Sequence, residues 1–209
     1  VARAVGFDHD HVRRRHRFIG FDRRREADRA SGLSEEALRA VAATLAGEGA
    51  TVLPVACDVT DPASVHAAAA RVQEAWGPAR VLVNNAAALY ADAVMDIGLE
   101  RWNQLLAVNL SGYLLCAQAF GRQMLAAGGG AMVHVSSIAA HVPQPYSGAY
   151  SVSKAGVAML SRQLALELGS QGVRSNLVSP AMIQTPLSES IYRDPQVRAQ
   201  RERMVPAGR

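Results

Sequence analysis

Tyr150 and Lys154 are the pair of residues in this chain best suited to acid–base chemistry. Lys154 is the only lysine, since 21 of the 22 Lys and Arg residues are arginine. An ammonium is a compact point charge and a guanidinium is a wide planar fork, so the single lysine is expected to do something that arginine cannot. Residues four positions apart share one face of a helix, and a cation beside a phenol favours the phenolate. We therefore expect Lys154 to lower the pKa of Tyr150 from its ordinary value of about 10.

The same spacing would also arise from a tyrosine and a lysine on the surface of a helix, so the surrounding residues decide between the two interpretations. Ser137 ends an apolar run, residues 131–137, that follows three consecutive glycines. Such a run is typical of a buried parallel strand. Catalytic groups in open α/β sheets lie just beyond the carboxyl ends of strands. Asn85 and Ala86 follow a second short apolar run, residues 80–83.

The rest of the chain alternates between expected strands and helices, as a doubly wound fold requires. Asp61 is expected to cap a helix that has Pro62 at its first position. The expected strands are 18–21, 51–56, 80–83, 131–137 and 173–178, and the expected helices are 34–46, 62–76, 100–126, 150–168 and 187–204. The sequence thus predicts a single α/β domain with a doubly wound, mostly parallel sheet of the Rossmann-like type.

These residues occur in the order and spacing of a known family. Over about residues 58–209, the chain resembles the classical short-chain dehydrogenase/reductase family. The resemblance implies an oxidoreductase that transfers a hydride between NAD or NADP and a small-molecule alcohol or ketone. It implies that Tyr150 is the general acid/base and that Lys154 lowers its pKa and binds the nicotinamide ribose. It also implies that Ser137 polarises the substrate oxygen and that Asn109 holds a water of the proton relay.

The resemblance also implies a set of cofactor-binding residues in addition to Tyr150 and Lys154. They are Asp58 and Val59 at the adenine, Asn85 and Ala86 beside the adenosine, and Pro180, Ile183 and Thr185 at the nicotinamide carboxamide. Asp22, at the end of the expected strand 18–21, would bond the adenine ribose. The adjacent arginines 23–25 could instead meet a 2′-phosphate, so NAD and NADP both remain open.

The start of the chain departs from the family pattern. The family has a glycine-rich turn that brings backbone N–H groups onto the pyrophosphate, whereas the first thirty residues contain only Gly6 and Gly20. Residues 1–29 therefore form an anomalous Arg- and His-rich segment, followed by the dehydrogenase/reductase domain at 30–209. The resemblance to the family also ends at a point where related chains would continue. We expect a fragment of an active enzyme or, as the alternative, an inactive remnant that cannot bind cofactor.

The charge distribution raises one further alternative. Residues 1–29 contain nine arginines and five acidic residues, so the whole net charge of +4 resides there. A basic arm that binds nucleic acid is disfavoured because no recognition fold accompanies it. The three histidines of the segment have no matching set of metal ligands, and no metal site is expected.

Composition gives an expectation for the location of the protein, and the resemblance gives one for its assembly. Hydrophobic residues make up 49% of the chain, no run of about 18 apolar residues indicates a membrane span, and no signal peptide is visible. A cytoplasmic location is the default expectation. The resemblance implies a homodimer or homotetramer formed through the expected helices 100–126 and 150–168.

Overall fold

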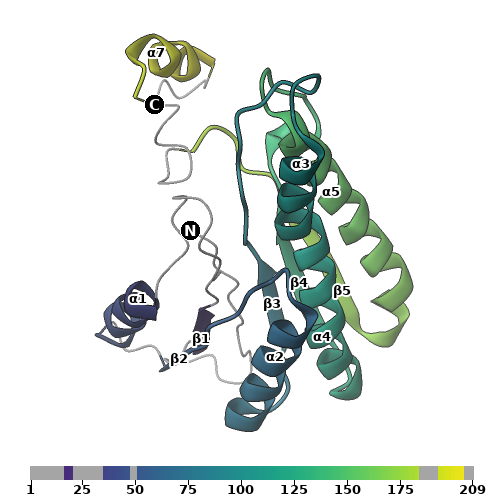
Figure 1. Cartoon of the computed structure of the whole chain (residues 1–209). Coiled ribbons are helices and arrows are strands. Elements are labelled where there is room, and N and C mark those ends of the chain that lie inside the picture. The colour runs from purple at the N-terminus through teal and green to yellow at the C-terminus, as the bar shows by residue number, and fades with distance from the viewer. Residues whose placement is uncertain (1–16, 21–34, 48–50, 184–192, 205–209) are drawn as a thin grey trace.

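The computed structural model describes residues 17–20, 35–47, 51–183 and 193–204 (Figure 1). Strands and helices alternate along these residues, as the sequence predicts. The elements are β1 (Arg17–Gly20), α1 (Glu35–Gly47), β2 (Thr51–Pro54), α2 (Pro62–Trp76), β3 (Val81–Asn84), α3 (Leu99–Leu106), the π-helical turn η1 (Ala107–Ser111), α4 (Gly112–Ala126), β4 (Gly130–Val135), the 3₁₀ turn η2 (Ile138–Ala140), α5 (Gly148–Leu168), the 3₁₀ turn η3 (Gly169–Gln171), β5 (Val173–Val178) and α7 (Pro195–Met204).

The described strands pair in two separate parallel sheets. β3, β4 and β5 form one sheet in that order, with Asn84 opposite His134 and His134 opposite Leu177. β1 and β2 form the other, and Figure 1 shows this pair beside α1, apart from the three-stranded sheet. Parallel strands joined by helices confirm the predicted α/β fold class.

Helices α4 and α5 cover the same face of the three-stranded sheet. A methyl group added to Gly121 of α4 would lie 2.8 Å from the end of the Met132 side chain on β4. Ser175, the partner of Met132 on β5, shares a 3.0 Å hydrogen bond with Ser161 of α5. Neighbouring residues on paired strands point to the same face, so both helices lie on that side. This helical layer carries three of the predicted catalytic residues, Asn109, Tyr150 and Lys154.

Helix α2 packs against α4 and begins as the sequence predicts. The Asp61 carboxylate accepts a 3.0 Å hydrogen bond from the Ala63 amide, and Pro62 occupies the first turn, where its missing N–H costs nothing. Gly77 ends the helix with φ of 79°, a left-handed conformation that favours glycine. The Gln123 amide of α4 donates to the Ala69 carbonyl at 2.8 Å and joins the two helices.

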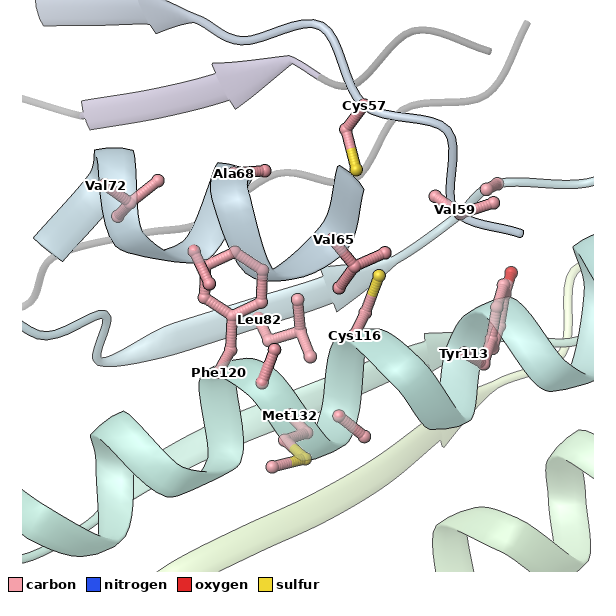
Figure 2. Close-up of a cluster of buried hydrophobic side chains, with 14 of the residues drawn as sticks. Cys57, Val59, Val65, Ala68, Val72, Leu82, Tyr113, Cys116, Phe120 and Met132 are labelled. Carbon is pink, nitrogen blue, oxygen red and sulfur yellow. The ribbon is translucent and has the colours of Figure 1, made fainter. Parts of the chain in front are cut away.

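The hydrophobic core lies between α2, α4 and the sheet. Figure 2 shows the buried side chains of this cluster, with Tyr113 at one end of the row that α4 contributes. Cys57 and Cys116 are buried in the same cluster, and burial raises the pKa of Cys57 to about 11 and that of Cys116 to about 12. Both thiols therefore act as small apolar groups.

The helix predicted at 100–126 is confirmed as a continuous helical stretch, but it contains one π-helical turn that the sequence did not predict. α3 ends at Leu106, one π-helical turn covers Ala107–Ser111, and α4 begins at Gly112. Such π turns insert one extra residue per turn and are frequent at functional sites. Sequence periodicity does not reveal the turn, because its residues are as apolar as those of a regular helix. The turn contains Asn109, one of the predicted catalytic residues.

Candidate active site

Lys154 and Tyr150 lie one turn apart on α5, and the predicted spacing does bring them together. The ammonium of Lys154 lies 5.7 Å from the centre of the Tyr150 ring. Lys154 is only 1% exposed, whereas Tyr150 is half-buried. Tyr150 is thus partly accessible to solvent, whereas the ammonium of Lys154 is enclosed by protein.

The buried ammonium of Lys154 is held by hydrogen bonds to groups on β4 and α4. It donates to the Val135 carbonyl at the end of β4 at 2.8 Å and to the Tyr113 hydroxyl at 3.4 Å. Burial disfavours the charged amine and lowers the pKa of Lys154 from 10.5 to about 8. A buried charge needs such acceptors, because they replace the water that it has lost.

The net pKa direction of Tyr150 differs from the sequence expectation. Burial is the largest cause and raises the pKa of Tyr150, while a hydrogen bond from Ser137 acts in the opposite direction. The Lys154 ammonium donates a hydrogen bond to the Val135 carbonyl. The net effect of the surroundings is to raise the pKa of Tyr150. The expected net decrease in the pKa of Tyr150 is therefore wrong for this structure, because desolvation outweighs the groups that favour the phenolate.

Ser137 lies beyond the carboxyl end of β4, where an open α/β sheet places catalytic groups. Its backbone is extended, with φ of −164°, and its hydroxyl accepts a 3.2 Å hydrogen bond from the Ala139 amide. This interaction begins the 3₁₀ turn that follows β4. The same hydroxyl interacts with the Tyr150 phenol, so the structure brings together the serine and the tyrosine that the sequence predicted.

Asn109 is fully buried in the π-helical turn, and its amide bridges three segments. Its Oδ1 accepts from the Ala88 amide at 2.7 Å, and its Nδ2 donates to the Ala88 carbonyl at 2.9 Å. The same Nδ2 donates to the Ser153 hydroxyl at 3.1 Å, and Ser153 donates to the Tyr150 carbonyl at 2.7 Å. Asn109 therefore connects the segment after β3 with the helix that carries Tyr150.

Sequence reasoning missed two residues of this site, Ser153 and Tyr113. Ser153 lies within the Tyr150–Lys154 motif, but its residue type alone predicts no role there. Tyr113 lies four residues after Asn109, on the far side of the Lys154 ammonium. Their roles depend on contacts between α4, α5 and β4, and no spacing along one element signals such contacts.

The residues predicted to bind cofactor lie in three segments at the carboxyl ends of strands. Asp58 and Val59 follow β2, Asn85 and Ala86 follow β3, and Pro180 and Ile183 follow β5. The Asp58 carboxylate accepts hydrogen bonds from both the amide and the hydroxyl of Thr60, and Val59 packs against Gly112 of α4. The Pro180 carbonyl accepts from the Ile138 amide at 3.1 Å. Asp22 and Thr185 lie outside the described residues.

Three polar side chains, those of Tyr150, Ser137 and Lys154, meet beyond the carboxyl end of β4. Tyr150 supplies an exchangeable proton, Ser137 supplies a hydroxyl beside it, and Lys154 supplies a buried cation. Within the described parts of the chain, no group of three or more His, Cys, Asp and Glu residues has the geometry of a metal site.

Among the described helices, none combines the length and the apolar character that a membrane span requires.

Comparison with known proteins identifies the family. A family profile described as enoyl-(acyl carrier protein) reductase matches residues 28–209. The chain belongs to the short-chain dehydrogenase/reductase family. D-threitol dehydrogenase of Mycolicibacterium smegmatis is 41% identical over 180 residues, which cover 86% of this chain and 69% of that protein. The inactive 2-(S)-hydroxypropyl-CoM dehydrogenase 2 of Xanthobacter autotrophicus is 35% identical over 186 residues, which cover 87% and 78%.

Solved structures of other short-chain dehydrogenases agree with this fold. A gluconate 5-dehydrogenase from Burkholderia cenocepacia, in complex with NADP and tartrate, has a TM-score of 0.80 and 27% sequence identity. The match covers 85% of this chain and 69% of that one. The chain is thus an oxidoreductase of the short-chain dehydrogenase/reductase family, and the resemblance drawn from its motifs is confirmed.

Proposed function

We propose that this short-chain dehydrogenase/reductase interconverts a secondary alcohol and the corresponding carbonyl compound, with NAD or NADP as the hydride carrier. The observation that carries the proposal is the meeting of Tyr150, Ser137 and Lys154, contributed by α5 and by the segment after β4. Such a group matches a reaction in which a proton leaves or joins an oxygen while a hydride leaves or joins the adjacent carbon.

Each residue has a defined task in this reaction. In the direction of oxidation, Tyr150 accepts the proton of the substrate hydroxyl, and Ser137 donates a hydrogen bond to the substrate oxygen. The buried charge of Lys154 stabilises the tyrosinate that transfers the proton. Asn109, through Ser153, fixes the turn of α5 that carries Tyr150. The nicotinamide supplies only the hydride acceptor.

The residues present fit the nicotinamide side of the cofactor better than its phosphate side. Lys154 offers ammonium donors at the end of β4, where the nicotinamide ribose would be bound, and the segment containing Pro180 and Ile183 lies at the end of the neighbouring strand β5. Asp58 and Val59 would meet the adenine. No glycine-rich turn occurs in the first thirty residues to receive the pyrophosphate. We therefore expect weak cofactor affinity, which raises the cofactor concentration that an assay needs.

The direct test is a dehydrogenase assay on the purified protein with millimolar NAD⁺ or NADP⁺. The substrates are secondary alcohols, beginning with D-threitol and gluconate because related enzymes bear those names. Reduced nicotinamide is expected to accumulate with the wild type and not with Tyr150→Phe at the same protein concentration. Equal rates for the two proteins would refute the assignment of Tyr150.

A second candidate function is that of a non-catalytic family member. A relative named as inactive is 35% identical to this chain, and the missing glycine-rich turn gives a physical reason for inactivity. The two candidates differ in one measurement. A non-catalytic member shows no turnover at any cofactor concentration, whereas a weakly binding enzyme gains activity as the cofactor concentration rises.

We further propose that α5 pairs with a second copy of this chain. Val152, Met159 and Leu166 are 49%, 59% and 78% exposed and recur every seven residues along α5. This spacing places them on one face, as in helices that pair along their length. A single apolar helix face can meet its own copy across a two-fold axis, which is the commonest symmetry of soluble oligomers.

A further inference from the structure

Tyr113 and Lys154 bind the same backbone oxygen from two different helices. The Tyr113 hydroxyl, on α4, donates to the Val135 carbonyl at 3.0 Å. The Lys154 ammonium, on α5, donates to that carbonyl at 2.8 Å and to the Tyr113 hydroxyl oxygen at 3.4 Å. The three groups form a closed triangle at the end of β4.

Both side chains are inaccessible to solvent, so water cannot replace these hydrogen bonds. Tyr113 and Lys154 are each 1% exposed. The ammonium also lies 5.1 Å from the centre of the Tyr113 ring, a distance at which the face of an aromatic ring attracts a cation. Figure 2 shows Tyr113 at the end of the hydrophobic cluster, where the packing of α4 fixes its ring. The hydroxyl is thereby presented from a rigid position.

The hydrogen-bonding roles within the triangle are mutually consistent. A carbonyl oxygen has two lone pairs and accepts both donors, while a phenol donates one hydrogen and still accepts. Because Tyr113 gives its hydrogen to Val135, its oxygen lone pairs remain available to the ammonium. Burial raises the pKa of Tyr113 well above its ordinary value, so the hydroxyl stays protonated wherever the protein is folded.

We propose that Tyr113 is a positioning residue for Lys154. Its hydroxyl and the Val135 carbonyl hold the ammonium at the end of β4, beside the ring of Tyr150. The consequence for catalysis rests on the proposed dehydrogenase function, but the holding of Lys154 does not. Among the described residues, the other titratable groups that face this site are Tyr150 on α5, Cys116 on α4 and His134 on β4, and burial keeps His134 neutral by lowering its pKa to about 4.

The composition of the chain permits a direct test of this proposal. Lys154 is the only lysine, so protein grown with isotope-labelled lysine gives one side-chain signal in an NMR spectrum. The pH dependence of that signal reports the pKa of Lys154 without any assignment or any enzymatic activity. The variants are Tyr113→Phe, which removes the hydroxyl and keeps the ring, and Tyr90→Phe, which removes a hydroxyl elsewhere as the matched control.

The expected result has a definite sign. Loss of the Tyr113 oxygen removes an acceptor from the ammonium and disfavours the charged form, so the pKa of Lys154 falls by about half a unit to one unit. Tyr90→Phe leaves it unchanged. A pKa of Lys154 that is the same in Tyr113→Phe and in the wild type would overturn the proposal.

A second measurement on the wild type covers the case in which Tyr113→Phe fails to fold. Magnetisation transfer between the terminal methylene of Lys154 and the Tyr113 ring protons is expected, and its absence would overturn the proposal. Where turnover is measurable, Tyr113→Phe shifts the pH profile of kcat, while a merely structural role would lower stability only. A shifted lysine pKa in an inactive protein would refute the dehydrogenase function and leave the role of Tyr113 intact.

Discussion

Asn109 donates a hydrogen bond to the hydroxyl of Ser153 at 3.1 Å, and both side chains are completely buried. This contact joins the π-helical turn η1 to α5, across 44 residues of sequence. Ser153 passes the constraint to the backbone of Tyr150 by its own 2.7 Å hydrogen bond. The position of the proposed acid/base is thus set by a polar network inside the protein rather than by α5 alone.

Tyr150→Phe is expected to abolish turnover and to leave cofactor affinity nearly unchanged. The substitution removes the acid/base hydroxyl and keeps the ring, and general acid/base groups contribute about 10²–10⁴-fold to rates. Steady-state kinetics give kcat, and a fluorescence titration gives the dissociation constant of the dinucleotide. A variant that retains wild-type kcat would exclude Tyr150 from the chemistry.

Lys154→Arg is expected to lower kcat and the thermal unfolding midpoint together. The ammonium lies 2.8 Å from the Val135 carbonyl in a fully buried position, and a wider planar guanidinium does not fit the same point. Differential scanning fluorimetry and kinetics measure the two effects. As a control for exchange of one cationic side chain for the other, Arg162→Lys at an exposed position of α5 should change neither quantity. An active, equally stable Lys154→Arg would show that the site needs only a positive charge.

His134 is expected to make the folded state sensitive to acid. Asn84 donates from Nδ2 to His134 Nδ1 at 3.1 Å, while the buried Nε2 of His134 has no hydrogen-bond partner among the described residues. Burial lowers the pKa of His134 from 6.5 to about 4, so between these pH values the unfolded chain binds a proton that the folded chain does not. The contribution of His134 to the free energy of unfolding is therefore fully present above pH 6.5. It is lost as the pH falls from 6.5 to 4, which lowers the free energy of unfolding by about 3 kcal/mol.

Urea unfolding of wild type and of His134→Leu at several pH values measures this contribution. The free energy of unfolding of the wild type should decrease more steeply between pH 6.5 and 4 than that of the variant. Parallel curves for the two proteins would mean that other groups cause the acid sensitivity.

The 209-residue chain is expected to bind NAD(H) and NADP(H) weakly. Its first thirty residues contain no glycine-rich turn, and the described strands β1 and β2 pair with each other but not with β3, β4 or β5. Backbone donors that would approach the pyrophosphate are therefore not supplied in the usual way. Isothermal titration calorimetry on the purified protein measures both affinities. A dissociation constant in the low micromolar range (about −8 kcal/mol of binding free energy) would contradict this expectation.

Met159→Glu combined with Leu166→Glu is expected to dissociate an oligomer formed through α5. The two side chains are exposed on one face, and burying a carboxylate opposite its own copy is strongly unfavourable. Sedimentation velocity compares the double variant with Met95→Glu, a charge at an exposed methionine outside α5. An unchanged sedimentation coefficient in the double variant of an oligomeric wild type would place the interface elsewhere.

Local rules account for the parts of the fold that the sequence predicted well. Asp61 and Pro62 define the start of α2 through one cap, and the strand predicted at 173–178 corresponds to β5. The pairing of Tyr150 with Lys154 follows from helical periodicity alone. The π-helical turn was not predictable in this way, because its sequence fits a continuous helix and only the contacts of Asn109 reveal it.

Residue types at fixed spacings were enough to predict the family, the parallel α/β architecture and the four polar residues of the proposed catalytic group. The contacts that hold those residues depend on tertiary packing. Desolvation sets the pKa directions of Tyr150 and Lys154, and desolvation is a property of the packed environment that no residue carries alone. Likewise, Tyr113, Val135 and Lys154 come from three separate elements, and only the packing of α4 and α5 on β4 brings them to one point.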